Sequence, residues 1–175
     1  FDKDHPVVNV TYKDALAMAQ WLSQRSNRLL GLPSEAQWEY ACRGGVYFPY
    51  NVGQSISTHQ ANFDGRKRSI FCNSGIFHGG TTAVEHFAEH ENGYGLLDMH
   101  GNVYEWCKDW YEGDYYQNSP NINPRSVWSS SGERVIRGGS WLSPALRIRS
   151  AYRDRFDPNN RDADIGFRLV GLAYP

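Results

Sequence analysis

Helical periodicity is confined to the first 45 residues of this 175-residue chain, so the rest must fold without long helices. Short strand-like segments are expected at residues 6–10, 102–109, 133–141 and 165–170. No helical segment alternates with these strands, which excludes the parallel sheet of a strand–helix–strand repeat. The sequence therefore predicts an α+β fold of two helices, short and mostly antiparallel strands, and extensive irregular loops.

The first expected helix begins after Thr11, where Asp14 stands three residues on as in a capping box. It ends at Asn27. Its apolar residues follow the i, i+3, i+4, i+7 spacing of one buried helix face: Tyr12, Ala15, Leu16, Ala19 and Leu22.

The second expected helix begins after Ser34, with Gln37 at the matching capping-box position. It carries Trp38 and Ala41 toward the core and ends at the glycine pair that starts with Gly44. These two helices are the only ones that the pattern supports.

Residues 46–94 are irregular, because Gly, Asn, Ser and Thr interrupt every apolar run. The 17 Gly and 8 Pro of the chain also favour many tight turns. A loop region this long in a compact domain is typical of a functional surface or of bound ions. The length fits one domain, residues 1–175, with a core of its own.

Composition excludes several partners. A net charge of −1 produces no strong field for nucleic acid. No apolar run approaches the roughly 20 residues that span a bilayer. The three cysteines are odd in number and form no C-x-x-C pair, which predicts buried free thiols. The chain starts at Phe1 without a signal-peptide pattern; a leader or upstream segment is expected to be missing, and the compartment stays open.

Residues 86–90 (HFAEH) match the H-x-x-E-H pattern of inverted zinc peptidases. That chemistry needs both histidines on one face of a stable helix. Thr81-Thr82 precede the motif and residues 92–95 (NGYG) follow it, which leaves too little room for such a helix. Histidines of a surface loop are the better interpretation.

The most specific block is residues 92–106 (NGYGLLDMHGNVYEW). Asp98, the carbonyls of Gly101 and Val103, and Glu105 are oxygen donors in a turn that leads into a strand. Hard oxygen donors at close spacing suit Ca²⁺. An ordinary Asp/Gly turn followed by a solvent-facing strand glutamate explains the same residues equally well.

Four further blocks accompany it: residues 32–41 (LPSEAQWEYA), 137–141 (RGGSW), 149–153 (RSAYR) and 165–168 (IGFR). Together the five blocks resemble the formylglycine-generating-enzyme, or sulfatase-modifying-factor, family in the family's own order. The resemblance runs from about Pro6 to Val170 and implies a C-type-lectin-like fold with little regular structure, held partly by calcium.

The resemblance assigns the calcium role to Asp98, Gly101, Val103 and Glu105. A second family calcium site would use Asn62 and the Phe63 carbonyl. Its acidic partner should fall near Ile76, where the chain has no carboxylate, so that second site is left open.

Aerobic enzymes of the family bind copper through two cysteines just after the GGS motif. Here Ser143 and Ala145 stand near those positions, and neither supplies the thiolate that copper(I) prefers. We therefore expect a non-catalytic domain. Two alternatives stay open: an oxidase or oxygenase that works with a segment outside this chain, and a structural module of a larger protein.

Residues 142–164 are expected to form a recognition loop with a protein as ligand, because their apolar and acidic residues follow neither a helical nor a strand period. The expected contact residues are Trp141, Leu142, Ser143, Pro144, Leu146, Ile148, Tyr152, Asp154, Phe156, Asp157, Asp162, Ala163 and Asp164. The arginines of this third of the chain are expected to form a scaffold of ion pairs and carbonyl contacts: Arg134, Arg137, Arg147, Arg149, Arg153, Arg155, Arg161 and Arg168.

One branch of the family, the variable proteins of diversity-generating retroelements, displays such a C-terminal loop, made by adenine-directed mutagenesis of a template rich in Asn codons. Each varied residue between 142 and 164 is reachable from an AAC codon by changing adenines. Lys, Glu, Gln and Met, which are not reachable, are absent there. Family members without such diversification end in similar Arg/Pro patterns, so both origins stay open.

Overall fold

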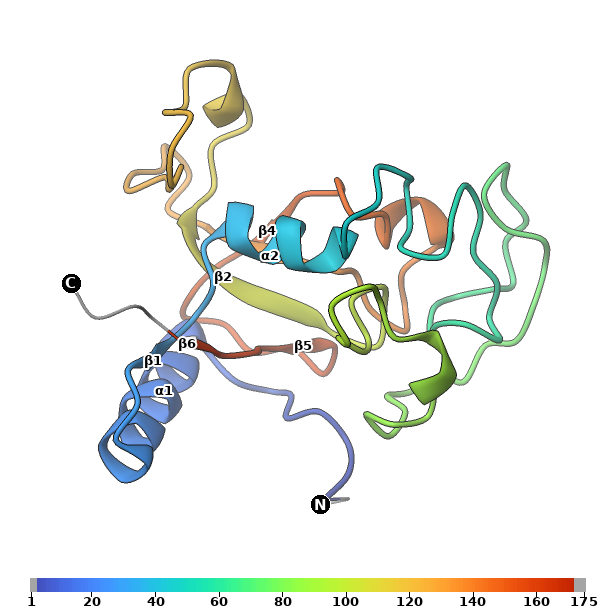
Figure 1. Cartoon of the computed structure of the whole chain (residues 1–175), viewed down its shortest axis with the longest axis horizontal. Helices are drawn as coiled ribbons and strands as arrows, with labels where there is room; N and C mark the ends of the chain where they lie inside the picture. Colours follow the sequence, from blue (N-terminus) through green and yellow to red (C-terminus); the bar gives the residue numbers. More distant parts are fainter. Residues whose placement is uncertain (1–2, 172–175) are drawn as a thin grey trace.

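The computed structural model describes residues 3–171 and places two helices beside two small sheets, with long loops covering the rest (Figure 1). The α-helices and strands are α1 (Tyr12–Ser26), β1 (Leu30–Gly31), α2 (Glu35–Arg43), β2 (Tyr104–Trp110), β3 (Arg134–Arg137), β4 (Asp154–Phe156), β5 (Ile165–Gly166) and β6 (Val170–Gly171). Three short 3-10 helices lie at Ala88–His90, Tyr115–Gln117 and Ala145–Arg147. No helix in the described part is long and apolar enough to cross a membrane.

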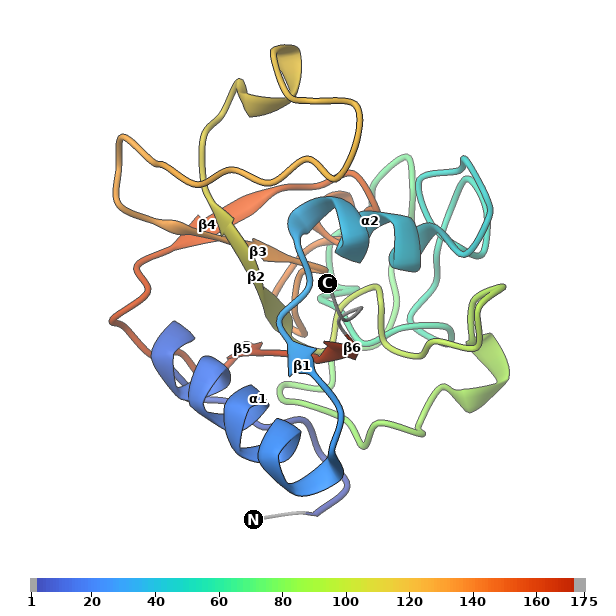
Figure 2. The ribbon, with the colours of Figure 1, turned by 60° about the vertical axis from the view of Figure 1, so that its left-hand side comes forward.

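Strand pairing is mostly antiparallel, as predicted. The larger sheet has the order β4-β3-β2-β5, with β2 parallel only to β5. The smaller sheet pairs β1 with β6, so the segment after α1 meets the end of the described chain (Figure 2). In both ribbon views the segment between β2 and β3 projects away from the body of the molecule.

Both capping boxes form as predicted. The Thr11 side chain accepts from the Asp14 amide and the Ser34 side chain accepts from the Gln37 amide. Asn27 and Gly44 end the two helices in the left-handed conformation. The prediction that Leu16 belongs to the buried face of α1 is wrong, because this side chain is 39% exposed. The buried face is narrower and consists of Tyr12, Ala15 and Ala19.

The strand predictions hold for three segments and fail for one. Strands form within 102–110, 133–141 and 165–171, each shorter than or shifted from the expected range. Residues 6–10 form no strand. The segment is irregular instead, and the Val7 carbonyl approaches Gly166 so closely that a Cβ on that glycine would clash with it.

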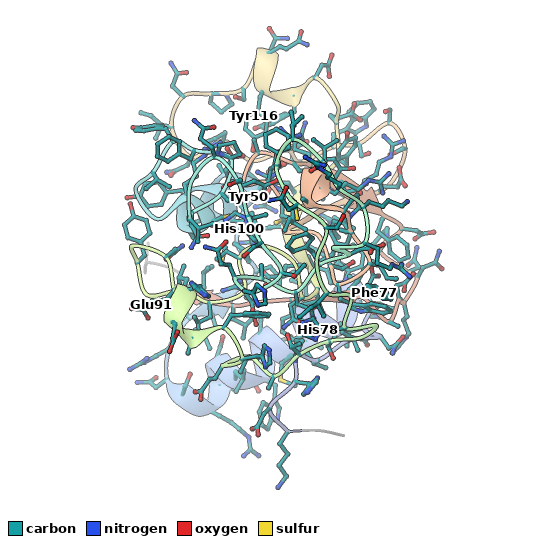
Figure 3. The ribbon with its side chains drawn as sticks, turned by 90° about the vertical axis from the view of Figure 1, so that its right-hand side faces the viewer. Tyr50, Phe77, His78, Glu91, His100 and Tyr116 are labelled. Atoms are coloured by element: carbon teal, nitrogen blue, oxygen red, sulfur yellow. The ribbon has the colours of Figure 1, made fainter. Side chains whose placement is uncertain are left out.

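Three apolar clusters make the core. The first surrounds Trp106 between α1 and the larger sheet, the second surrounds Phe63 and Ile148 under the loops, and the third surrounds Trp38 between α2 and β2. Figure 3 views the loop-covered side, where the Tyr50 and His100 rings meet edge to face at 5.5 Å. The three cysteines are buried and free, which confirms their prediction.

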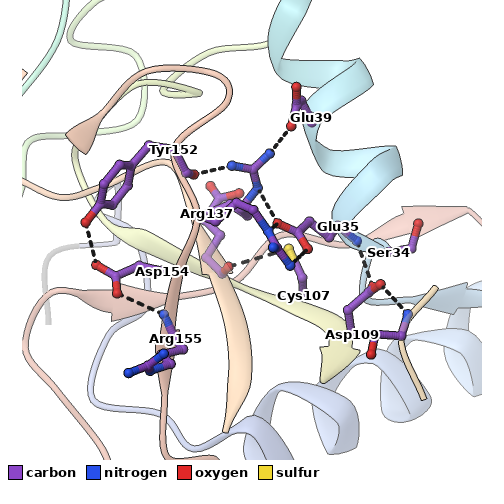
Figure 4. Close-up of polar contacts among 12 residues, drawn as sticks. Ser34, Glu35, Glu39, Cys107, Asp109, Arg137, Tyr152, Asp154 and Arg155 are labelled. Carbon is purple, nitrogen blue, oxygen red and sulfur yellow. Dashed lines mark hydrogen bonds and ion pairs between the residues drawn. The ribbon is translucent and has the colours of Figure 1, made fainter. Parts of the chain in front are cut away.

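A buried ionic network joins α2 to the larger sheet (Figure 4). The fully buried Arg137 guanidinium lies 3.3 Å from the Glu35 carboxylate and also pairs with Glu39. Arg153 approaches Glu35 at 2.7 Å. Arg168 pairs with Glu105 at 2.5 Å. These contacts confirm the scaffold prediction for the arginines that form them.

Candidate ligand-binding cleft and calcium segment

Segment 142–164 borders a surface cleft of about 230 Å³ beside the edge strand β4. We call it the 142–164 cleft. Six of the predicted contact residues line it: Leu142, Ser143, Asp154, Phe156, Asp162 and Asp164. Framework residues supply the remaining walls, namely Tyr104, Ile136, Arg147, Arg155 and Ile165. The structure thus gathers part of the predicted set at one place.

Hydrogen bonds fix two of the carboxylates in the cleft. The Tyr104 hydroxyl donates to Asp154 Oδ2 at 3.1 Å, and the Tyr152 hydroxyl reaches the same oxygen at 3.4 Å. The Ser140 hydroxyl donates to Asp164 Oδ2 at 2.6 Å. Burial raises the pKa of Asp164, and neighbouring Asp162 raises it further. The cleft therefore presents oriented carboxylates beside apolar side chains.

Two predicted contact residues, Ile148 and Ser143, are buried, and of these only Ser143 borders the cleft. For Ile148 the prediction is wrong. Ile148 is fully buried in the cluster around Phe63, where its carbonyl contacts His100 Nδ1 at 2.7 Å. Ser143 is 5% exposed, and its hydroxyl donates to the Tyr104 hydroxyl at 3.4 Å. Both anchor the segment to the framework, because a loop held on a core must bury some of its own side chains.

The remaining predicted residues lie outside the cleft lining. Leu146, Asp157 and Ala163 are exposed, while Trp141, Pro144 and Tyr152 are half-buried. Trp141 packs its ring 5.9 Å from the Phe77 ring. Phe156 has two roles, since its ring also packs 6.0 Å from Trp106 in the core.

The segment is also more regular than a loop. It contains the 3-10 helix Ala145–Arg147 and the strand β4, which pairs with β3 through Ile136 and Val135. The sequence could not indicate β4, because Asp154 and Arg155 are poor strand formers and only tertiary pairing holds them there.

The sequence predicts scaffold roles for Arg147 and Arg155 and indicates no site role for Tyr104. Arg155 does pair with Glu133 at 2.9 Å, yet it lines the cleft too. Within residues 3–171, Arg147 makes no ion pair or side-chain hydrogen bond. Arg147 stands between exposed Leu146 and buried Ile148, so no sequence signal marks it as a cleft residue.

The predicted calcium ligands lie mostly at another surface. Asp98, Val103 and Glu105 line a separate cleft of about 410 Å³, which Gly101 does not border. Burial raises the pKa of Asp98 to about 6, and its Oδ2 accepts from Asn102 Nδ2 at 2.9 Å. A half-buried carboxylate is a donor that suits a hard cation.

Glu105 fits the same cation less well. Its carboxylate accepts from Trp38 Nε1 at 2.6 Å, from Arg168 Nε at 2.5 Å and from Arg168 Nη2 at 2.7 Å. The solvent-facing glutamate that served as the alternative is therefore wrong, since Glu105 is 5% exposed. Within the described chain no three His, Cys, Asp or Glu side chains cluster to hold a metal. A cation at Asp98 would rest largely on carbonyl oxygens.

Asn62, the residue of the second family calcium site, is fully buried. Its Nδ2 donates to the Gly80 carbonyl at 2.9 Å and to Thr82 and Asn102, whereas its Oδ1 has no partner in residues 3–171. The H-x-x-E-H segment forms a turn followed by the 3-10 helix Ala88–His90. His86 is exposed there and packs edge to face on Phe87, as a surface-loop histidine does.

These features define two small sheets flanked by two helices, with surface clefts bordered by loops. The family model described as sulfatase-modifying factor enzyme 1-like domain matches residues 2–173. The chain belongs to this family.

Two relatives show how much of a longer protein the chain can represent. It is 40% identical over 168 residues to serine/threonine-protein kinase pkn1 of Chlamydia caviae, covering 95% of this chain and 24% of the relative. It is 36% identical over 180 residues to the formylglycine-generating enzyme of Streptomyces coelicolor, covering 97% of this chain and 54% of that enzyme. The chain thus spans between about a quarter and about half of these proteins.

Two solved structures confirm the predicted fold. PvdO from Pseudomonas aeruginosa superposes with a TM-score of 0.79 at 32% identity, covering 95% of this chain and 61% of that one. Treponema denticola variable protein 1 superposes with a TM-score of 0.77 at 25% identity, covering 97% of this chain and 72% of that one. The architecture is the C-type-lectin-like fold of the formylglycine-generating type.

Proposed function

We propose that this domain is a non-catalytic recognition module that binds a protein partner through the 142–164 cleft and the exposed residues around it. The observation that carries this proposal is the mixed chemistry of the cleft. Leu142 and Phe156 offer apolar area beside fixed carboxylates, while buried Ser143 and Ile148 hold the segment from beneath. The exposed side chains of such a surface can be substituted while the buried side chains continue to hold the segment in place.

The resemblance to a protein named as variable supports a diversified origin for this segment. The encoding locus tests that origin. We expect a downstream near-copy of the coding region for residues 142–164 that differs only at adenines, next to a reverse-transcriptase gene. A locus without such a copy would contradict the diversified origin and leave a fixed recognition surface.

A second candidate is an oxidase of the formylglycine-generating type that acts with a further segment. Relatives of that name in Streptomyces coelicolor and Mus musculus, each 36% identical, favour it. Against it, the side chains near the expected cysteine positions are the buried Ser143 and Ala145. Copper content and thiol-dependent oxygen uptake of the full-length protein separate the two candidates: the recognition proposal predicts neither.

We also propose that Ca²⁺ binds at Asp98 with the carbonyls of Gly101 and Val103. Glu105 would join only by exchanging its Arg168 contact for the cation. Bound there, the cation would compensate the half-buried Asp98 carboxylate and fix the turn that leads into β2.

A further inference from the structure

A further hollow, of about 490 Å³, lies between α2, Lys108 of β2 and residues 123–125. Its lining includes Tyr40, Lys108 and Arg125, and it shares no lining residue with the 142–164 cleft. We call it the Lys108–Arg125 hollow.

Two cations in this hollow lack a counter-ion. Lys108 is half-buried at the hollow, whereas its neighbours on β2, Cys107 and Asp109, are fully buried. Within residues 3–171, neither Lys108 nor Arg125 has a carboxylate at ion-pair distance. Burial, together with Arg125, lowers the pKa of Lys108. An anion between the two cations would relieve this repulsion.

Asp109, the carboxylate that follows Lys108 in the sequence, already accepts two hydrogen bonds. Asp109 Oδ2 accepts from the Glu35 amide at 2.8 Å, and Oδ1 accepts from the Ser126 amide at 2.9 Å. The Asp109 carboxylate therefore caps the first turn of α2 and also holds the Ser126 amide, in the segment that precedes β3. Lys108 and Arg125 therefore remain able to attract an anion from solution. This attraction comes from the two side chains and not from the amino end of α2.

Tyr40 gives the hollow a flat and fixed wall. Its side chain is 68% exposed on α2, and its ring stacks on the Tyr94 ring at 5.4 Å with an interplanar angle of 29°. One face of the Tyr40 ring is thus held by Tyr94 while the ring stays available at the border of the hollow. A rigid aromatic side chain loses little entropy when a second ring packs on it.

We propose that the Lys108–Arg125 hollow binds a phosphate monoester carried on a ring. The Arg125 guanidinium offers the planar fork that matches phosphate oxygens and Lys108 offers a point charge. The ring of the ligand packs against Tyr40. The ring is either a sugar or an aromatic group, and the relative affinities of the two kinds of phosphate distinguish them.

Titration calorimetry at low salt with inorganic phosphate, phenyl phosphate and glucose 6-phosphate tests the proposal. We expect one ring phosphate to bind more tightly than inorganic phosphate, and its identity assigns the ring. Arg125→Gln and Lys108→Gln should each weaken binding about tenfold. Tyr40→Ala should reduce the ring phosphate to the affinity of inorganic phosphate.

Lys67→Gln is the matched control, because Lys67 is an exposed lysine outside the hollow. It should leave all affinities unchanged, and Lys108→Arg should retain binding if Lys108→Gln unfolds. The proposal is overturned if no phosphate binds, if Lys67→Gln weakens binding equally, or if Tyr40→Ala has no effect. None of these outcomes bears on the 142–164 cleft.

Discussion

At the scale of single residues, the molecule depends on charges that are buried and paired. Glu35 is 1% exposed and forms ion pairs with both Arg137 and Arg153, so it links α2, β3 and the start of β4. A buried ion pair does not stabilise a fold strongly compared with apolar packing, but removal of one partner leaves an uncompensated charge.

Glu35→Gln should therefore lower the free energy of unfolding by about 3 kcal/mol, measured by urea denaturation. Glu133→Gln is the matched control, because the Glu133–Arg155 pair is largely exposed and should contribute less than about 1 kcal/mol. Equal effects of the two changes would show that the Arg137 network is not buried in solution.

The thiols give a second residue-scale prediction. Burial raises the pKa of Cys42 to about 12 and raises that of Cys107 as well, so both remain protonated thiols at neutral pH. Native protein at pH 8 should give no fast reaction of these two thiols with a disulfide reagent, and all three cysteines should react after unfolding in guanidinium. Rapid labelling of Cys42 in native protein would contradict the described packing.

At the scale of elements, the base of segment 142–164 rests on a glycine that no other residue replaces easily. Gly139 has φ +71°, and a Cβ there would lie 2.5 Å from Ile148 Cγ2 and 3.1 Å from the Arg147 carbonyl oxygen. The close approach fixes the 3-10 helix Ala145–Arg147 against the turn after β3.

Gly139→Ala should cost about 3 kcal/mol, since backbone strain and overpacking add. Gly132→Ala separates the two effects, because Gly132 has nearly the same φ of +72° and nothing within 4 Å of a Cβ. Thermal denaturation should show a loss near 1 kcal/mol for Gly132→Ala. A Gly139→Ala variant no less stable than Gly132→Ala would mean that the close approach is absent.

Element boundaries show what sequence reasoning can reach. Both helices were predicted with their capping boxes, because caps and periodicity are local signals carried by Thr11, Asp14, Ser34 and Gln37. β4 was not predicted, because its pairing with β3 is a long-range contact. The same limit applies to the 142–164 cleft. Leu142 and Asp164 could be predicted as contact residues from the sequence, but the burial of Ile148 could not.

At the scale of the whole molecule, a small regular core supports loops that provide most of the surface chemistry. If Ca²⁺ binds at Asp98, a concentration 100-fold above its Kd should stabilise the protein by about 2.7 kcal/mol and raise the Tm. Differential scanning calorimetry with calcium and then with a chelator measures this. Asp98→Asn should abolish the shift; a Tm that ignores calcium, or a shift that survives Asp98→Asn, would contradict the site.

The central claim is that segment 142–164 combines anchors that serve the core with exposed positions that serve a ligand. Substitution of every residue from 142 to 164, scored by resistance of displayed protein to proteolysis, tests it most directly. We predict that Leu142 and Leu146, each 48% exposed, and Asp157 accept most residues, whereas Ser143, Ile148 and Ser150 accept few. If Leu142, Leu146 and Asp157 proved as intolerant as Ile148, the segment would be part of the core, and the recognition surface would not exist.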